Sequence, residues 1–119
     1  IGNGTSGQSA LAPTVVSGLG AARLSLGDEH SCAVTTSATS ACWGADDKGQ
    51  VGDGSASGAN QPFSHSLSGV TEIASGTRFS CALVANGGAL QCWGDNSASQ
   101  LGAVAVPFST SPIALPLSR

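Results

Sequence analysis

Four cysteines carry the clearest chemistry in this 119-residue chain, and they fall into two pairs with similar spacing. Cys32 and Cys42 are ten positions apart, and Cys81 and Cys92 are eleven apart. Such thiols form disulfides, bind a metal or remain as buried free thiols. Zinc sites use closer cysteine pairs, and no histidine stands at a matching spacing, so we favour two disulfides and predict no metal site.

Strand register tests these pairings. If Asn86-Gly87 forms the two-residue turn of a β-hairpin, counting outward places Cys81 opposite Cys92. Directly opposed residues of an antiparallel pair have Cα atoms about 4.5–5.5 Å apart, which a disulfide can bridge. The first pair needs an odd-numbered turn centred on Ser37. Disulfides persist in oxidising compartments, so we expect a secreted or cell-surface protein.

Three carboxylates, Asp46, Asp47 and Asp53, crowd one glycine-rich stretch around Lys48. Carboxylates in such a loop can hold calcium, but the spacing does not match the pattern D-x-[DN]-x-[DN]-G of calcium-binding loops. We interpret the stretch as a solvated turn.

The two histidines are candidates for proton transfer. His30 lies two residues before Cys32, and the matching place before the second cysteine pair holds Phe79. A position that accepts either ring is typical of packing. His65 stands among serines, and we expect it to face solvent. Neither histidine has an evident carboxylate partner at short range, so we predict no catalytic residue.

Two glycine and serine patterns were weighed for enzymatic roles. Residues 2–7 fit G-x-G-x-x-G, but a dinucleotide-binding loop needs a preceding strand and a following helix, and here Pro13 and Val15-Val16 follow. The G-x-S-x-G pattern of serine hydrolases does not occur. We therefore expect no cofactor and no enzymatic activity.

Charge and hydropathy exclude further classes. The chain has four basic and seven acidic residues, for a net charge of −3. So few cations cannot neutralise a run of phosphates, so nucleic-acid binding is not expected. No apolar run approaches the ~18 residues of a membrane span, and no basic-then-apolar signal opens the chain. Since the chain does not begin with Met, we expect a processed chain or an excised piece.

The sequence repeats with a period of about fifty residues. Gly27–Val34 recurs 49 positions later as Gly76–Leu83, and Cys42-Trp43-Gly44 recurs 50 positions later as Cys92-Trp93-Gly94. Residues 101–119 share the phase of residues 1–19. We interpret residues 1–119 as a single repeat region with units of approximately 1–50 and 51–100 and a partial unit at 101–119.

Each unit is predicted to be β. Short runs bounded by Gly, Asn, Asp and Ser predict four strands in the first unit, at 12–16, 22–26, 31–35 and 39–43. Four short strands in about 50 residues are typical of one β-propeller blade. One blade cannot bury its own faces, and propellers close with about four to eight blades. The expected fold class is all-β, with two complete blades and part of a third, as an incomplete propeller or part of an assembly.

The residues that repeat show a family resemblance. The pattern G-x-x-x-S-C-A-[VL], then C-W-G, then [GS]-Q-[VL]-G resembles the regulator of chromosome condensation repeat, in the cysteine-containing form of secreted bacterial proteins. The likeness covers essentially the whole chain. It implies a propeller, usually seven-bladed, that serves as a binding scaffold. Known members include a nucleotide-exchange factor, a photoreceptor and a β-lactamase inhibitor, and their functions lie in loops that do not transfer to this chain.

Trp43 and Trp93 follow equivalent cysteines, and we expect them to fill the space between blades and cover the disulfides. Gly44 and Gly94, directly after them, are expected to be structural in the same way. Exposed loops, Asp46–Gly49 and Ala56–Gln61, should present the contact surface. The residues expected to make contacts there are Asp46, Asp47, Lys48, Asp53 and Asn60.

The favoured function is a non-catalytic extracellular scaffold that binds protein: other propeller repeats, copies of itself or an unknown extracellular protein. The alternative is a self-assembling subunit, in which residues 101–119 begin a blade that another copy completes, giving rings or filaments. An inhibitor or regulator of another protein ranks third, because the visible loops lack an aromatic patch.

Overall fold

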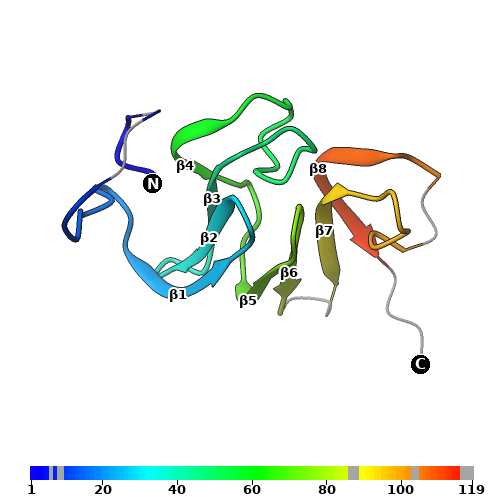
Figure 1. Ribbon diagram of the computed structural model, residues 1–119. Coiled ribbons are helices and arrows are strands. Elements are labelled where there is room, and N and C mark those ends of the chain that lie inside the picture. Colours follow the sequence, from blue (N-terminus) through cyan, green and yellow to red (C-terminus); the bar gives the residue numbers. More distant parts are fainter. Residues whose placement is uncertain (6, 8–9, 86–88, 103–104, 116–119) are drawn as a thin grey trace.

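The computed structural model describes residues 1–5, 7, 10–85, 89–102 and 105–115, and within them the chain is all-β. Two four-stranded antiparallel sheets lie side by side, each a meander in chain order (Figure 1). Blade one contains β1 (Ala21–Leu26), β2 (His30–Thr35), β3 (Ser40–Gly44) and β4 (Ala59–Ser64). Blade two contains β5 (Val70–Ser75), β6 (Phe79–Val84), β7 (Leu90–Asp95) and β8 (Phe108–Leu115). No helix in the described part is long and apolar enough to cross a membrane.

The cysteines lie where the register argument placed them. Cys32 is opposite Cys42 and Cys81 is opposite Cys92, with Cα–Cα distances of 4.1 Å in both pairs. Both pairs form disulfides, so the predicted pairing is confirmed. The β2–β3 register is centred on Ser37 as expected, since Cys32 and Cys42 are equidistant from it. The Asn86-Gly87 turn lies outside the described residues.

One predicted strand is wrong. Segments 22–26, 31–35 and 39–43 correspond to β1, β2 and β3, but residues 12–16 form no strand. The stretch fifty positions later overlaps β4, which is the outermost strand of blade one and pairs only with β3. A strand forms there because β3 offers a free edge, whereas no strand precedes residues 12–16 in the described part of the given sequence. The sheets therefore cover 21–64 and 70–115, out of phase with the sequence units.

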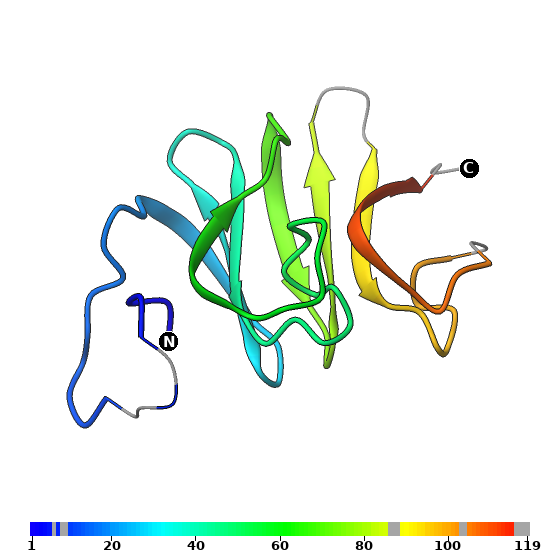
Figure 2. The ribbon, with the colours of Figure 1, turned by 90° about the horizontal axis from the view of Figure 1, so that it is seen from above.

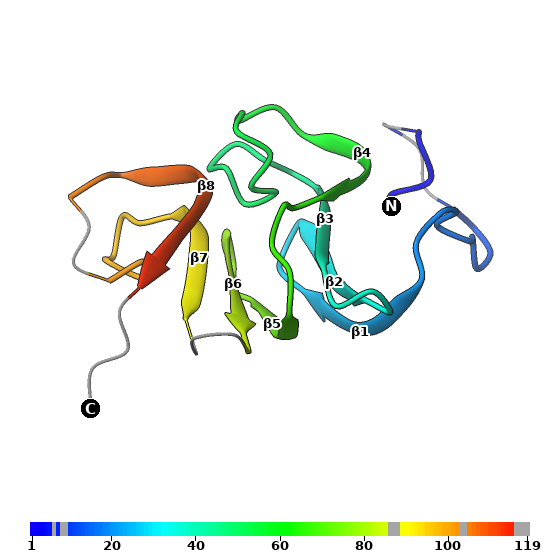
Figure 3. The same ribbon diagram turned by 180° about the vertical axis from the view of Figure 1, so that it is seen from behind.

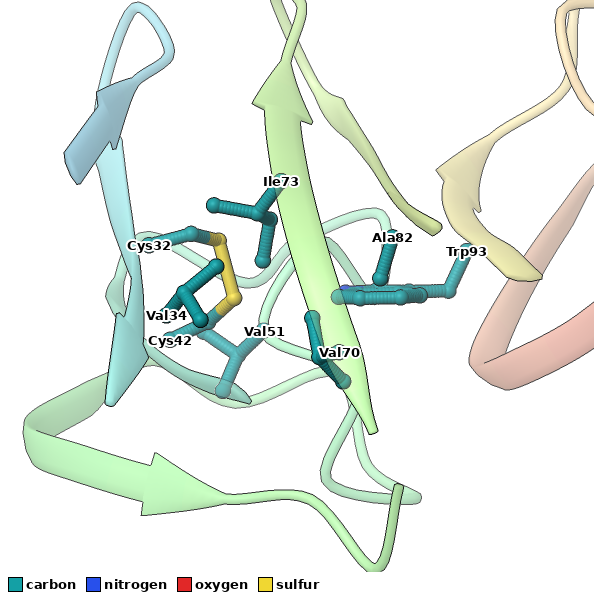
Figure 4. Packing of buried hydrophobic residues seen from close by; sticks show 8 residues of the cluster. All are labelled: Cys32, Val34, Cys42, Val51, Val70, Ile73, Ala82 and Trp93. Atoms are coloured by element: carbon teal, nitrogen blue, oxygen red, sulfur yellow. A yellow bond between two sulfur atoms is a disulfide. The ribbon is translucent and has the colours of Figure 1, made fainter. Parts of the chain in front are cut away.

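The core lies between the two sheets, not within either one. Blade one contributes the Cys32–Cys42 disulfide with Val34 and Val51, and blade two contributes residues 70, 73, 82 and 93. Figure 4 shows Ile73 pointing toward the disulfide, with the ring of Trp93 beyond Val70. From above, β5 lies directly beside blade one (Figure 2). Each blade therefore needs a neighbouring blade to bury its disulfide face.

The two disulfides differ in exposure, and we predict that they differ in reducibility. Cys32 and Cys42 are fully buried under blade two, whereas Cys81 is half-buried on the outer face of blade two. Because thiol exchange needs access to a sulfur atom, mild dithiothreitol should reduce Cys81–Cys92 first. Pulsed alkylation with peptide mapping measures the order.

Both bonds should open at the same rate in denaturant, which serves as the control. The oxidised chain should also be lighter than the reduced chain by four hydrogens, two for each of its two disulfides. Equal reduction rates in the native chain would contradict the shielding of Cys32–Cys42.

Candidate functional site

A serine–histidine pair bridges the two blades. His30 Nε2 lies 2.8 Å from Ser80 Oγ, and the Cys32 sulfur lies 3.4 Å from the same hydroxyl. His30 and Ser80 are both buried, and burial lowers the pKa of His30. The histidine therefore acts as a neutral packing and hydrogen-bonding group, as its exchange with Phe79 in the second repeat predicts.

The expectation that His65 faces solvent is wrong. Its side chain is buried, with Nε2 2.7 Å from the Val51 carbonyl oxygen and Nδ1 3.0 Å from Ser40 Oγ. A carbonyl only accepts, so Nε2 donates to the Val51 oxygen, while Nδ1 lies within hydrogen-bond distance of both the Ser40 hydroxyl and the Ser40 carbonyl oxygen, the latter at 3.2 Å. Burial lowers the pKa of His65, and its ring centroid lies 4.7 Å from that of Trp93. Neighbouring serines suggested exposure, but His65 lies directly after β4 and packs against Val51 of the β3–β4 connection.

The serine hydroxyls of both pairs are closed off from any substrate in the folded chain. The Ser40 and Ser80 side chains are both 0% exposed. A nucleophilic hydroxyl must reach the atom that it attacks, so these pairs serve the fold. Each pair gives a buried serine hydroxyl a hydrogen-bond partner, whereas His30 Nδ1 is buried without one among the described residues.

Trp93 holds the seam between the blades, whereas Trp43 packs against Gly2. Trp93 is fully buried and donates from Nε1 to the Gln50 carbonyl of blade one at 2.8 Å. Gly44 and Gly94 have φ of 110° and 104°, and a Cβ there would lie 2.6 Å from the Glu29 oxygen and 2.5 Å from the Arg78 oxygen. The register shifts between Cys42 and Gly44 and between Cys92 and Gly94, where the extra residues lie on the partner strands β4 and β8.

Asp46 is not a contact residue, contrary to expectation, because it is only 2% exposed. Its Oδ1 accepts the Val51 N–H at 2.8 Å, and Asn96 Oδ1 accepts the Leu101 N–H at the same distance in the next repeat. The side chain thus closes a turn. Burial raises the pKa of Asp46 to about 6, and the Asp53 charge adds to the rise while the Val51 N–H opposes it.

The other predicted contact residues lie along the β3–β4 connection. Asp47 is exposed, 3.4 Å from the Arg78 guanidinium, and the hydrogen bond from Gln50 lowers its pKa first, with Arg78 adding to this. Lys48 and Asp53 are half-buried. Asp53 Oδ1 accepts the Ser55 N–H at 2.9 Å. Asn60 lies within β4, so the predicted loop at 56–61 ends at residue 58.

This connection reaches across to the outer strand of blade two. The Gly54 N–H donates to the Thr110 oxygen of β8 at 2.8 Å, and Figure 3 shows the connection beside β8. Between them lies a pocket of about 230 Å³. Its lining combines a carboxylate, serines and two apolar rings: Gly52, Asp53, Gly54, Phe63, His65, Ser66, Ser111 and Pro112. The described residues contain no group of three or more His, Cys, Asp or Glu side chains that could hold a metal ion.

Asp46 should make stability depend on pH, and Asp46→Asn should remove that dependence. A carboxyl whose pKa rises from 3.8 to about 6 on folding contributes stability below pH 4 that is lost as pH rises through 6. At pH 7 the variant should melt about 4 °C higher, the shift given by ~1 kcal/mol in a chain of this size.

The difference in melting temperature between wild type and Asp46→Asn, followed from pH 4 to 8, is the measurement. Asn96→Asp is the reciprocal control and should add a second loss of stability over the same range. A difference that is constant with pH would contradict the assignment.

Gly52 and Gly54 form a matched pair, because both have positive φ but only Gly52 is enclosed. A Cβ on Gly52 would lie 2.8 Å from Trp93 Nε1 and His65 Nε2, whereas nothing lies within 4 Å of one on Gly54. Gly54→Ala should cost about 1–2 kcal/mol of unfolding free energy for backbone strain alone. Gly52→Ala should cost ~1–3 kcal/mol more, for overpacking. Urea titration measures both, and equal losses would show that the seam at Trp93 is loosely packed.

Comparison with known proteins agrees with this fold. Human WBSCR16 superposes with a TM-score of 0.71 at 22% identity over 82% of this chain and 26% of its own. Prp20p from Saccharomyces cerevisiae, studied for its binding to Gsp1p and histones, gives 0.73 at 16% identity over 88% of this chain and 27% of its own. Yeast RCC1 (Prp20) in complex with Kap60 gives 0.73, with 26% of that protein covered.

The chain thus spans about a quarter of the length of these structures. No curated protein gives a match. The family model described as the Regulator of chromosome condensation (RCC1) repeat matches residues 22–50 and 70–100, which include both disulfides, both tryptophans and the glycines that follow them. Both sheets are β-propeller blades, and the chain belongs to the RCC1 repeat family.

Proposed function

We propose that the chain is part of a non-catalytic extracellular propeller scaffold that acts through protein–protein contacts. One observation carries the proposal: the groups that could do chemistry are consumed by the fold. All four thiols are in disulfides, and the hydroxyls of both serine–histidine pairs are fully buried. What remains at the surface are loops with few charges, which suit recognition of another protein.

The extracellular placement rests on the disulfides. Each blade has one disulfide between its two middle strands, at equivalent positions. Disulfides of this kind are rare where glutathione keeps thiols reduced. Because each described blade has a disulfide, an oxidising compartment is the location that we propose for this scaffold.

The contact surface that we assign is the end of the blades where the β3–β4 connection meets β8. Asp47, Lys48 and Asp53 supply charge there, and the pocket beside Phe63 has room for one side chain of a partner. A protein partner is also in keeping with the relatives, since the yeast protein is described with Gsp1p, histones and Kap60. We propose no contact with nucleic acid and no insertion into membranes.

Site-specific photo-crosslinking of the secreted full-length protein tests this surface. A photoreactive residue replacing Ala56, exposed in the β3–β4 connection, should capture a protein partner. The same residue replacing Ser37, exposed in the β2–β3 turn at the opposite end of the blade, should capture none. Equal capture at both positions would contradict the assigned surface. Hydrolytic or nucleotide-exchange turnover by the purified chain would contradict a non-catalytic role.

A further inference from the structure

The pocket of about 230 Å³ between the β3–β4 connection and β8 combines one charged group with apolar side chains. Among the described residues that line it, the charge is the Asp53 carboxylate, and the apolar side chains are those of Phe63 and Pro112. Both ring nitrogens of His65 already lie within hydrogen-bond distance of groups of the fold. A ligand in this pocket would therefore meet a negative charge beside hydrocarbon.

The charge of Asp53 is not balanced by a cation within the described part of the chain. Its Oδ1 accepts the Ser55 N–H at 2.9 Å and the Ser55 hydroxyl at 2.8 Å, which use the two lone pairs of that oxygen. The ion pairs between described residues involve other carboxylates, those of Asp47 and Glu72. Oδ2 of Asp53 thus keeps its capacity to accept from a charged donor outside the chain.

A second carboxyl lies close to Asp53. Asp46 is 2% exposed, and its Oδ2 is buried without a hydrogen-bond partner among the described residues. Burial first, and then the charge of Asp53, raise the pKa of Asp46 to about 6. Because like charges at short distance oppose ionisation of both groups, a cation held at Asp53 would stabilise the pair.

The first repeat contains an uncharged version of the same turn. Asn3 stands fifty positions before Asp53, and its Oδ1 accepts the Thr5 N–H at 3.1 Å and the Thr5 hydroxyl at 2.7 Å. The turn therefore needs a side-chain oxygen but no charge. The negative charge of Asp53 is thus additional to what the fold requires.

The pocket is open because β8 has a short side chain beside it. The register of β4 on β3 and of β8 on β7 makes Gln61 the equivalent of Ser111. A Cβ on Gly4 would lie 3.0 Å from Gln61 Nε2, whereas nothing lies within 4 Å of a Cβ on Gly54, the equivalent of Gly4. Ser111 therefore leaves open the space that a glutamine occupies in the other repeat.

These features suit a lysine side chain better than an arginine. The hydrocarbon stem of lysine can pack on Phe63 and Pro112 while its ammonium reaches a carboxylate. Arginine binds a carboxylate best through two parallel hydrogen bonds, one to each oxygen, and Ser55 already occupies Oδ1 of Asp53. An ammonium is a compact charge that can be held by the remaining oxygen alone.

We propose that this pocket binds a lysine side chain of the partner protein, with the ammonium at Asp53 and the stem against Phe63 and Pro112. Ser111 leaves room for the side chain, and Asp53 selects its charge. The proposal rests on the scaffold function, and it specifies the chemistry of the partner at the surface assigned there.

NMR titration of the secreted full-length protein with blocked tripeptides tests the pocket. Acetyl-Gly-Lys-Gly-amide should shift the amide resonances of Gly52 and Gly54 with a Kd in the millimolar range, as expected for a single side chain. The norleucine peptide has the stem without the charge, and the arginine peptide has the charge in another geometry. Each should bind at least about fivefold more weakly than the lysine peptide.

Three variants identify the groups responsible. Asp53→Asn reproduces Asn3 and Ser111→Gln reproduces Gln61, so both should fold as the first repeat does. Both should weaken binding of the lysine peptide by about tenfold, the first by removing the charge and the second by filling the pocket. Asp47→Asn is the matched control, because it removes an exposed carboxylate of the same connection outside the pocket, and it should bind as wild type does. Unchanged amide resonances away from the pocket would show that the variants fold.

Several results would overturn the proposal: no shifts with the lysine peptide, equal binding of the norleucine or arginine peptide, wild-type affinity in Asp53→Asn or Ser111→Gln, or an equal loss in Asp47→Asn. Crosslinking at Ala56 distinguishes this failure from failure of the scaffold function. Capture of a protein partner at Ala56 without lysine binding would reject the pocket alone. Lysine binding that depends on Asp53 and Ser111, without capture at Ala56, would reject the assigned surface alone.

Discussion

The face of a blade that holds the disulfide is apolar, and only another blade can bury it. In blade one this requirement is met: the strand β5 covers Cys32–Cys42, and Ile73 and Val70 complete the core. The remaining features of the seam depend on that contact. Three interactions join the blades only because the two sheets pack together. They are the His30–Ser80 and Trp93–Gln50 hydrogen bonds and the Arg23–Glu72 ion pair. The disulfide holds two strands in register, but only the neighbouring sheet buries the disulfide and so completes a core.

Much of the fold could be predicted from the sequence because the repeat carries local information twice. The cysteine spacing and the turn chemistry fixed the pairing of β2 with β3 and of β6 with β7. The outermost strand could not be placed in the same way. Residues 12–16 and the segment of β4 stand at overlapping places in the repeat, but among the described residues only the latter follows a β3 with a free edge. Strand propensity identifies a segment that can pair, and the tertiary context decides whether a partner exists.

The site was less predictable, for a related reason. Asp46 and His65 are polar residues in serine- and glycine-rich surroundings, where exposure is the ordinary expectation. Both are buried because backbone groups of the β3–β4 connection need hydrogen-bond partners. The Val51 N–H donates to Asp46 Oδ1, and the Val51 oxygen accepts from His65 Nε2. One signal was available in the sequence. Asn96 stands where Asp46 does in the other repeat, and a position shared by aspartate and asparagine often closes a turn through its side-chain oxygen.

The offset between sequence unit and sheet has a consequence for how such a chain can lengthen. Each sheet takes its outermost strand from the beginning of the following unit, as β4 does at 59–64 and β8 at 108–115. A tandem duplication of one fifty-residue unit would therefore insert a whole blade, because the outer strand of any unit can complete the sheet before it. Each unit is joined to the next because its sheet includes a strand from that next unit. A blade added by duplication would therefore have a neighbouring blade, a strand register and a packed interface from the start. The offset between sequence unit and sheet thus allows the fold to gain blades by duplication of a unit.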